Sequence, residues 1–140
     1  MQNYKNHRQI VLTYHGLTWL PALALLIGSV INLINSSKEN LYSASLIVLI
    51  ALILISIMLH ARRFALIAQD RAIRAEENLR HFILTGRSLD ARLTLGQVIA
   101  LRFASDEEFP ALAQRAADEA LSNNAIKKEV KTWRPDHYRV

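Results

Sequence analysis

The sequence predicts an all-α protein in which two membrane-spanning helices form a hairpin and the second helix continues into a small cytoplasmic helical domain. The distribution of charge carries this prediction. Residues 9–37 and 40–61 contain no Asp, Glu, Lys or Arg, although the chain has 17 basic and 12 acidic residues. From residue 62 onward, charged residues return at high density. Such an uneven distribution indicates two environments, one of which excludes water.

The second span, residues 41–61, has the stronger apolar character. Between Leu41 and Leu59, twelve residues are Leu, Ile or Val. Together they contribute on the order of −5 kcal/mol to membrane insertion. As a helix, the uncharged window 40–61 would be about 33 Å long, close to the thickness of the hydrocarbon core of a bilayer.

The first span, residues 17–34, contains more small and polar residues. Pro21 falls in its first turn, where a missing N–H costs little. Ala24, Gly28 and Asn32 share one face and predict a close approach of the second helix, with Asn32 hydrogen-bonded there. We favour such ordinary helix packing over a ligand or ion pathway. A cleaved signal peptide is the alternative for this span, but its apolar stretch is long and no small-x-small cleavage site follows it.

Residues 35–40 are six polar residues, enough to reverse the chain and too few to form a domain. Lys5 and Arg8 precede the first span and the turn has only Lys38, whereas four arginines follow the second span: Arg62, Arg63, Arg71 and Arg74. The positive-inside rule therefore predicts that residues 1–16 and 62–140 are cytoplasmic. A soluble bundle with the hairpin at its centre is the alternative, but the remaining residues are too few and too charged to cover two spans.

The second span is predicted to run without a break into an amphipathic stem that ends near residues 85–86, where Gly86 suits a helix C-cap. Salt bridges between residues four apart are expected along it, for the pairs Asp70–Arg74 and Glu76–Arg80. One apolar face of the stem consists of Ala68, Ala72, Ala75, Leu79 and Phe82. We expect this face to pack against later helices of the same chain, and a coiled coil between two protomers is the alternative.

Three further helices are expected. Residues 93–104 predict a largely buried helix, although a strand fits the apolar run equally well by periodicity alone. Ser105 and Glu108 have the spacing of a capping box, with Ser105 as N-cap of a helix that continues to about Leu121. Residues 122–124 (Ser-Asn-Asn) are predicted to break the chain before a last helix at residues 125–133, which Pro135 terminates.

The sequence contains no recognisable catalytic, metal-binding or nucleotide-binding motif. The absence of cysteine excludes disulfides and thiolate ligands. The acidic run 106–108 would fan around a helix instead of converging, so it predicts a helix cap and no metal site. We therefore expect no cofactor and no enzymatic activity. An enzyme acting at the membrane surface through Asp70, His81 or Glu108 is an alternative without positive support.

Residues 127–140 mix basic and aromatic side chains. This mixture is compatible with binding of nucleic acid, which we disfavour, or with contact to an anionic leaflet. We favour a terminal segment that Trp133 and Tyr138 dock onto the domain core.

Several stretches of the chain resemble a bacterial family of short two-span membrane proteins, the domain-of-unknown-function family 6526. They are QNYKNH at 2–7, QDRAIRAEE at 69–77, IALRFASDEE at 99–108, IKK at 126–128 and WRPDHYR at 133–139. The resemblance covers nearly the whole chain and implies a bacterial inner-membrane protein with the topology given above. The family has no established activity, so the resemblance transfers no functional residue.

The expected function is that of a non-enzymatic, membrane-anchored interaction or scaffold module. It would contact the lipid bilayer and present a polar surface to a second copy or to a membrane protein partner. The candidate surface residues are Arg71, Arg74, Glu77, Arg102, Asp106 and Glu108, although these charges could instead pair within the fold. The alternative is an accessory subunit of a transporter or other membrane complex, with Ala24, Gly28 and Asn32 contacting the spans of another protein.

Overall fold

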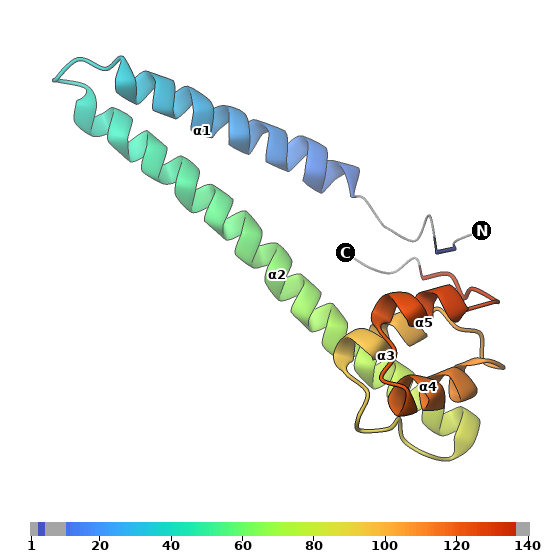
Figure 1. Cartoon of the computed structure of the whole chain (residues 1–140). Coiled ribbons are helices and arrows are strands. Elements are labelled where there is room, and N and C mark those ends of the chain that lie inside the picture. The colour runs from blue at the N-terminus through green and yellow to red at the C-terminus, as the bar shows by residue number, and fades with distance from the viewer. Residues whose placement is uncertain (1–2, 5–10, 137–140) are drawn as a thin grey trace. The chain divides into compact units, whose positions relative to one another are not determined.

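The computed structural model describes residues 3–4 and 11–136, so the predictions that rest on Lys5, Arg8 and Tyr138 lie outside the described residues. The chain divides into two compact units, residues 10–65 and residues 66–140 together with residues 1–9. We call residues 10–65 the apolar unit and residues 66–140 the helical domain. In the described part of the chain all regular secondary structure is helical, as predicted (Figure 1).

Two long helices form the apolar unit. A π-helical turn, η1 (Thr13–Thr18), leads into α1 (Trp19–Ile34), and α2 (Leu41–Thr85) follows after the turn. Both helical segments are long and apolar enough to cross a membrane. Pro21 is the third residue of α1, but η1 continues into α1 without a break, so Pro21 lies inside the helical segment 13–34 and the prediction that it falls in the first turn is wrong. The two predicted apolar helices and the turn at residues 35–40 are therefore confirmed, with the first helical segment beginning at Thr13.

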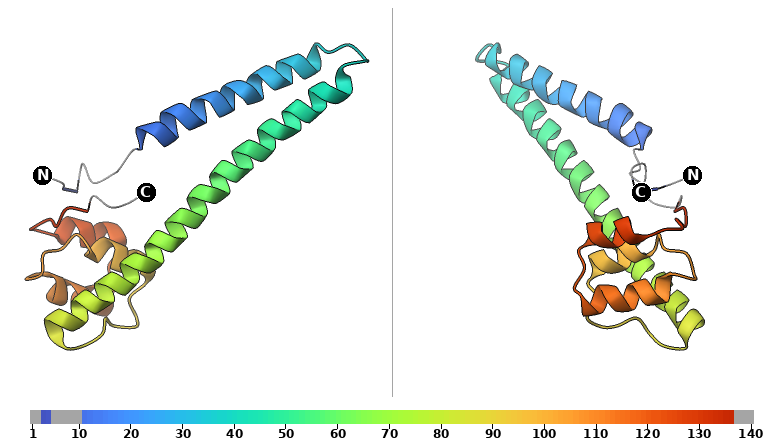
Figure 2. Two further views of the ribbon diagram at one scale, coloured as in Figure 1. Left: turned by 180° about the vertical axis from the view of Figure 1, so that it is seen from behind. Right: turned by 45° about the vertical axis from the view of Figure 1, so that its right-hand side comes forward.

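Within the apolar unit, α1 and α2 lie close together at the turn and spread apart with distance from it (Figures 1 and 2). The most buried side chains of the unit are small: Ser29 is 4% exposed, Ala44 2% and Ala51 1%. The Ser29 hydroxyl donates to the Leu26 carbonyl at 2.8 Å, so this polar group is satisfied inside its own helix. The side chain that α1 buries, Ser29, is therefore small and hydrogen-bonded within its own helix.

The predicted packing stripe of α1 is wrong. Ala24, Gly28 and Asn32 are all exposed. A Cβ atom added at Gly28 would meet nothing within 4 Å, so no neighbour requires glycine there. A buried Asn32 amide would need a hydrogen-bond partner from another helix, whereas the Ser29 hydroxyl is bonded to a carbonyl of its own helix.

A second group of contacts joins the two helices of the apolar unit near residue 60. The Tyr14 hydroxyl donates to the Met58 carbonyl at 3.3 Å. The Arg62 guanidinium lies 5.0 Å from the centre of the Tyr14 ring, within the range of a cation–π interaction. Tyr14 and Arg62 are residues that favour a membrane–water interface.

The stem, residues 66–85, is the continuation of α2, which runs unbroken from Leu41 to Thr85 as predicted. Gly86 has a φ of 72°, and its N–H donates to the Phe82 carbonyl at 2.8 Å. Glycine adopts this left-handed conformation without steric cost, which explains why the helix ends here.

The stem buries a different face from the one the alanine pattern predicts. Ile73 is 7% exposed and Glu77 5%. The buried face carries Ile73 together with Glu77, whose carboxylate pairs with Arg80. The residues predicted to pack against the later helices are exposed, and that prediction is wrong for Ala68, Ala72, Ala75, Leu79 and Phe82.

Three short helices complete the helical domain: α3 (Leu95–Leu101), α4 (Phe109–Asp118) and α5 (Asn123–Glu129). The predicted buried helix within 93–104 is confirmed as α3. The Thr94 hydroxyl accepts the Gln97 N–H while the Gln97 side chain accepts the Thr94 N–H, a capping box that starts this helix. The largest fully buried side chains are Phe103, Phe109, Leu101, Ile126 and Val98.

The two C-terminal helices are shorter than predicted. Helix α4 ends at Asp118 and α5 at Glu129, so the predicted ends at Leu121 and Trp133 are wrong. Ser122 marks the predicted break, but it does so as the N-cap of α5, accepting the Ala125 N–H at 3.2 Å. Its cap allows the two asparagines that follow to enter the helix.

After α5 the chain becomes extended and returns to α3. Ala104 and Trp133 form an antiparallel bridge, and the Arg134 N–H donates to the Phe103 carbonyl at 2.8 Å. The Trp133 ring lies 4.8 Å from the Phe103 ring. Docking of the terminal segment through Trp133 is therefore confirmed, with a bridge in place of the predicted helix because extended backbone lets residues 133 and 134 bond to the segment after α3.

Ala120 provides the first prediction. It follows α4 with a φ of 48°, and the Leu121 N–H donates to the Ala116 carbonyl at 3.2 Å, the bond of a Schellman cap. Because a Cβ is strained in this conformation, Ala120→Gly should stabilise the helical domain by about 0.5–1 kcal/mol. Chemical denaturation, monitored by limited proteolysis, measures this change in the free energy of unfolding. Ala111→Gly, within α4, should destabilise by about 1 kcal/mol, and equal effects of the two substitutions would contradict this assignment.

Candidate functional site

Arg80 of the stem connects α2 to the segment between α3 and α4. Its Nε donates to Asp106 Oδ1 at 2.7 Å, its Nη1 to Glu77 Oε2 at 2.9 Å and its Nη2 to the Ala104 carbonyl at 2.7 Å. The guanidinium also lies 4.4 Å from the centre of the Phe109 ring. The Arg80 side chain is only 11% exposed. It is therefore a buried cation with three oxygen partners and an aromatic face.

Glu77 is the buried anion of this cluster. Its side chain is 7% exposed, and besides Arg80 it faces the Arg134 guanidinium at 3.7 Å. An unpaired carboxylate at such a depth would be strongly destabilising. The cluster thus joins α2, the α3–α4 segment and the extended C-terminal segment.

Arg102 holds the same C-terminal segment from α3. Its Nε lies 3.0 Å from Asp136 Oδ2, and its guanidinium lies 4.7 Å from the centre of the Phe103 ring. Glu77, Arg102 and Arg134 contribute to the lining of one cavity of about 400 Å³, which Ile73, Glu76, Pro135 and Asp136 complete.

Glu108 also has an internal role. Its carboxylate accepts the Ser105 N–H at 3.2 Å and the N–H groups of Lys131 and Thr132, each at 3.1 Å. The predicted capping box is therefore only half correct: Glu108 reaches back to Ser105, but α4 begins at Phe109 and Ser105 is not its N-cap. The hydrogen bonds from the backbone of residues 131–132 to Glu108 join residues far apart in sequence, so the spacing of Ser105 and Glu108 does not predict them.

Of the six predicted surface residues, Glu77 and Arg102 are buried and Glu108 is partly buried and bonded to backbone N–H groups. The other three stay accessible. Arg71 and Arg74 are exposed on the stem, and the Asp106 side chain is 62% exposed although it pairs with Arg80. Pairing within the fold, the alternative for this set, occurs for Asp106, which ties the segment after Ser105 to Arg80 of the stem, whereas Glu77 pairs with Arg80 inside the stem itself.

Sequence spacing missed the residue at the centre of the cluster. Arg80 was expected to pair with Glu76, four residues earlier, but its partner is Glu77, three residues earlier. Both spacings are compatible with a helical pair. Glu77 is buried and Glu76 is exposed, and Arg80 pairs with the buried one of the two.

Arg71 and Arg74 border an open pocket beside the stem. It has a volume of about 480 Å³ and is lined further by Ala75, Asn78, Leu93, Val98 and residues 88–91. The Asn78 amide oxygen accepts the Leu89 N–H at 2.9 Å, which fixes the 88–93 segment along the stem.

Comparison with known families identifies the chain. The sequence profile of the family of unknown function DUF6526 matches residues 1–140. The chain belongs to this family. No curated protein and no solved structure matches it significantly.

The candidate enzyme residues of this DUF6526 protein have structural neighbours. His81 Nδ1 lies 2.8 Å from the Arg87 carbonyl, and the His81 ring packs edge-on against Phe109 at 5.8 Å. Glu108 is occupied by three backbone N–H groups, as described above. Among residues 3–4 and 11–136, no three His, Asp or Glu side chains gather as a metal site requires.

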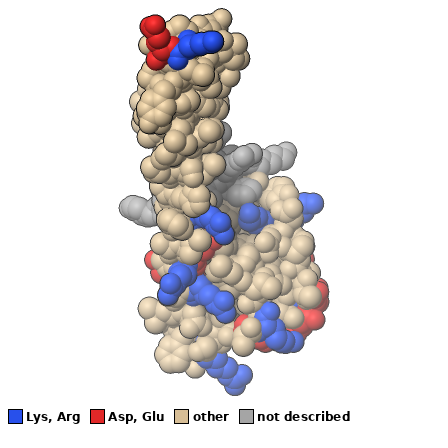
Figure 3. Space-filling view, turned by 90° about the vertical axis from the view of Figure 1, so that its left-hand side faces the viewer, with Lys and Arg blue, Asp and Glu red and all other residues tan. Residues whose placement is uncertain are grey.

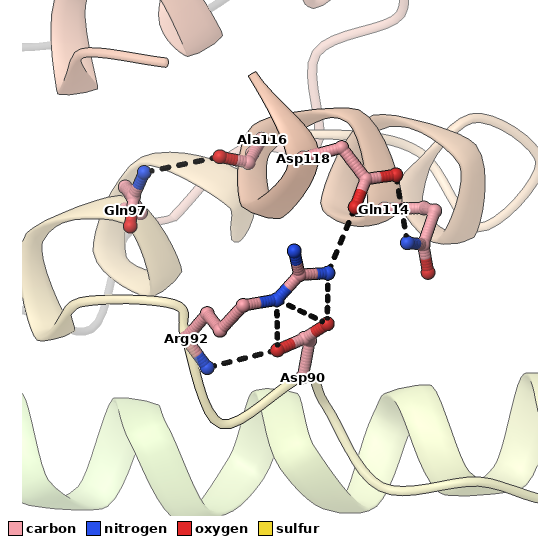
Figure 4. A network of polar contacts seen from close by, with 6 residues as sticks. All are labelled: Asp90, Arg92, Gln97, Gln114, Ala116 and Asp118. Atoms are coloured by element: carbon pink, nitrogen blue, oxygen red, sulfur yellow. Dashed lines mark hydrogen bonds and ion pairs between the residues drawn. The ribbon is translucent and has the colours of Figure 1, made fainter. Parts of the chain in front are cut away.

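A second polar network of the DUF6526 domain lies on its surface (Figure 4). The Arg92 guanidinium contacts Asp90 Oδ2 at 2.6 Å and Asp118 Oδ1 at 2.8 Å, and Gln114 donates to Asp118 Oδ2 at 2.9 Å. Nearby, the Gln97 amide donates to the Ala116 carbonyl at 3.2 Å. These contacts attach the 88–93 segment and α3 to α4.

The second prediction concerns the pH dependence of this network. Hydrogen bonds from the Arg92 side chain lower the pKa of Asp90 to about 2. A depressed carboxyl pKa stabilises the fold above the unfolded-state pKa of about 4, and this contribution is lost as the pH falls toward the folded-state value. NMR titration should give an Asp90 pKa near 2. Wild type should also be more stable than Asp90→Asn at pH 6, and this difference should shrink as the pH falls from 4 toward 2; an Asp90 pKa of about 4 would contradict the network.

Proposed function

We propose that this protein is a two-pass inner-membrane protein whose transmembrane hairpin anchors a non-enzymatic interaction module at the cytoplasmic face. The observation that carries the proposal is the exposure of the apolar helices. In the most apolar stretches of the two helical segments, only 6% and 11% of residues are buried. Large apolar side chains such as Leu20, Ile50 and Ile57 are more than half exposed. A soluble monomer rarely exposes more than a few hundred Å² of continuous apolar surface, whereas lipid accepts such a surface.

This exposure argues against the soluble alternative. The core helix of a soluble bundle would be mostly covered by its own chain, and these two are not. On the face shown in Figure 3, the apolar helices present an uncharged surface next to the charged turn. The cluster of Arg62, Arg63, Arg71 and Arg74 after the second span, against Lys38 alone in the turn, supports a cytoplasmic helical domain.

The proposed interaction surface consists of the three predicted surface residues that the fold leaves accessible: Arg71, Arg74 and Asp106. Among residues 3–4 and 11–136, Arg71 and Arg74 join no ion pair. They lie on a rigid helix directly after the second span. A rigid element that holds charged groups at a fixed height from a membrane suits binding of a protein partner more than catalysis.

The test is affinity capture with the full chain in nanodiscs, using solubilised membranes as the source of partners. Wild type should retain a specific protein, and Arg71→Ser/Arg74→Ser should lose it. Arg115→Ser, which removes an exposed charge from α4, serves as the matched control and should retain the partner. A wild-type protein that stays monomeric and without partner would contradict the proposal.

A second candidate function, an accessory subunit of a larger membrane complex, is favoured by the exposed α1 stripe. Ala24, Gly28 and Asn32 are exposed, and a Cβ added at Gly28 would meet nothing within 4 Å, so a span of another protein could approach α1 closely there. Crosslinking from Gly28→Cys in membranes should then yield an adduct with another membrane protein. Crosslinks confined to the chain's own helices would contradict this function.

A further inference from the structure

The exposed stripe of the stem has the spacing of a coiled coil. Its members follow one another at alternating steps of four and three residues: Ala68, Ala72, Ala75, Leu79 and Phe82. In a heptad, Ala72 and Leu79 occupy a positions, and Ala68, Ala75 and Phe82 occupy d positions. Leu79 and Phe82 are 59% and 53% exposed. Leu79 and Phe82 are two large apolar side chains on a helix whose other face packs against the domain. Their exposure indicates a surface that another protein chain covers.

The helical domain leaves this stripe accessible. Residues of the stem that pack against the domain are Ile73, Glu77, Arg80 and His81. At about 100° per residue, the centre of this covered face lies roughly opposite the centre of the stripe. The 88–93 segment borders the stripe at Asn78, through the Leu89 hydrogen bond.

The charges that flank the stripe are complementary to those of an identical, parallel helix. Arg71 is at a g position and Glu76 at the following e position. In a parallel coiled coil, a g residue of one helix meets the next e residue of its partner. Neither Arg71 nor Glu76 joins an ion pair within the described part of the chain. Symmetry would form the Arg71–Glu76 contact twice, once on each side of the interface.

We propose that the stem pairs with the stem of a second copy as a short parallel coiled coil. This inference rests on the proposed membrane anchoring, since two copies inserted in the same direction present their stems in parallel and in the same register. The alanines allow close approach of the two helices, and Leu79 and Phe82 supply the larger apolar contact. Anchoring also raises the effective concentration of each stem for the other, so that a short interface suffices.

Single cysteines test the interface, because the chain has no cysteine of its own. Ala72→Cys and Ala75→Cys should each form a disulfide-linked dimer under mild oxidation in native membranes. Arg74→Cys is the matched control: it is exposed and adjacent to residue 75, but it occupies a c position, too far from its symmetry mate for a disulfide. Absence of dimers at 72 and 75, equal dimers at all three positions, or an adduct with a different protein would each overturn the proposal.

Charge reversal tests the identity of the partner. In the Ala75→Cys background, Arg71→Glu or Glu76→Arg alone should reduce the disulfide-linked dimer roughly fivefold, and the two together should restore it. An unrelated partner or an antiparallel arrangement would not be restored by the double reversal. A chain that remains in the membrane fraction without dimers would refute the coiled coil and leave the anchoring intact, whereas a chain in the soluble fraction would refute the anchoring itself.

Discussion

Replacing Arg80 by alanine should lower the free energy of unfolding of the helical domain by about 3–5 kcal/mol. The substitution removes three hydrogen bonds and the contact with Phe109. It also leaves Glu77 deep in the fold, with only Arg134 at 3.7 Å to compensate it. The desolvated carboxylate is the larger part of the expected effect, because a buried charge without a close partner costs more than a lost surface interaction.

Pulse proteolysis of the full chain in nanodiscs, at increasing urea concentration, measures this change. Arg115→Ala is the control: it removes an arginine with ion pairs to Glu119 and Glu129, but its side chain is 52% exposed, and the expected cost is about 0–1 kcal/mol. Adding Glu77→Gln to Arg80→Ala should recover part of the loss by removing the stranded charge. Equal, small effects of Arg80→Ala and Arg115→Ala would show that the cluster does not hold the stem to the domain.

Phe109→Ala should be comparably destabilising, by about 3–5 kcal/mol. Phe109 is fully buried, belongs to the core cluster and lies beneath both Arg80 and His81. Its removal leaves a cavity at the first residue of α4. The neighbouring chain is held in place by the hydrogen bonds of Glu108 and by the core, so it cannot collapse into that cavity. The same proteolysis assay measures the effect.

The matched control for Phe109 is Ile83→Ala, which removes an apolar side chain that is 73% exposed and should change stability by about 0.5 kcal/mol or less. Because Phe109 and Arg80 are in contact, the double substitution should cost less than the sum of the two single ones. Strict additivity would indicate that the cation–π contact contributes nothing to the fold.

The long helices, the turn between them and the end of α2 could be predicted from the sequence because local properties determine them, whereas the start of the first helical segment at Thr13 was not predicted. Uncharged apolar stretches identify the two helical segments of the apolar unit, and the polar run at residues 35–40 identifies the turn. Gly86 ends α2 because one residue with a positive φ is enough to close a helix. Each of these features depends on residues that are neighbours in the chain.

The helix faces that pack could not be predicted in the same way. On the stem, the regular alanine spacing predicts the wrong face: the face that is buried carries Ile73 and the ion pair between Glu77 and Arg80. The Arg80 side chain of that pair also donates to Ala104 and Asp106, which are more than twenty residues away in sequence. Similarly, Glu108 has cap spacing relative to Ser105, but its long-range acceptor role for residues 131–132 follows only from the folded chain.

Cysteine accessibility in intact bacterial cells tests the membrane topology most directly. In a chain without native cysteine, Ser37→Cys in the turn and Ala111→Cys in α4 both give exposed thiols. A membrane-impermeant maleimide should label residue 37 in cells with a permeabilised outer membrane, and residue 111 only after the inner membrane is broken. Labelling of residue 111 before lysis, or protection of residue 37 until lysis, would contradict the proposed two-pass topology.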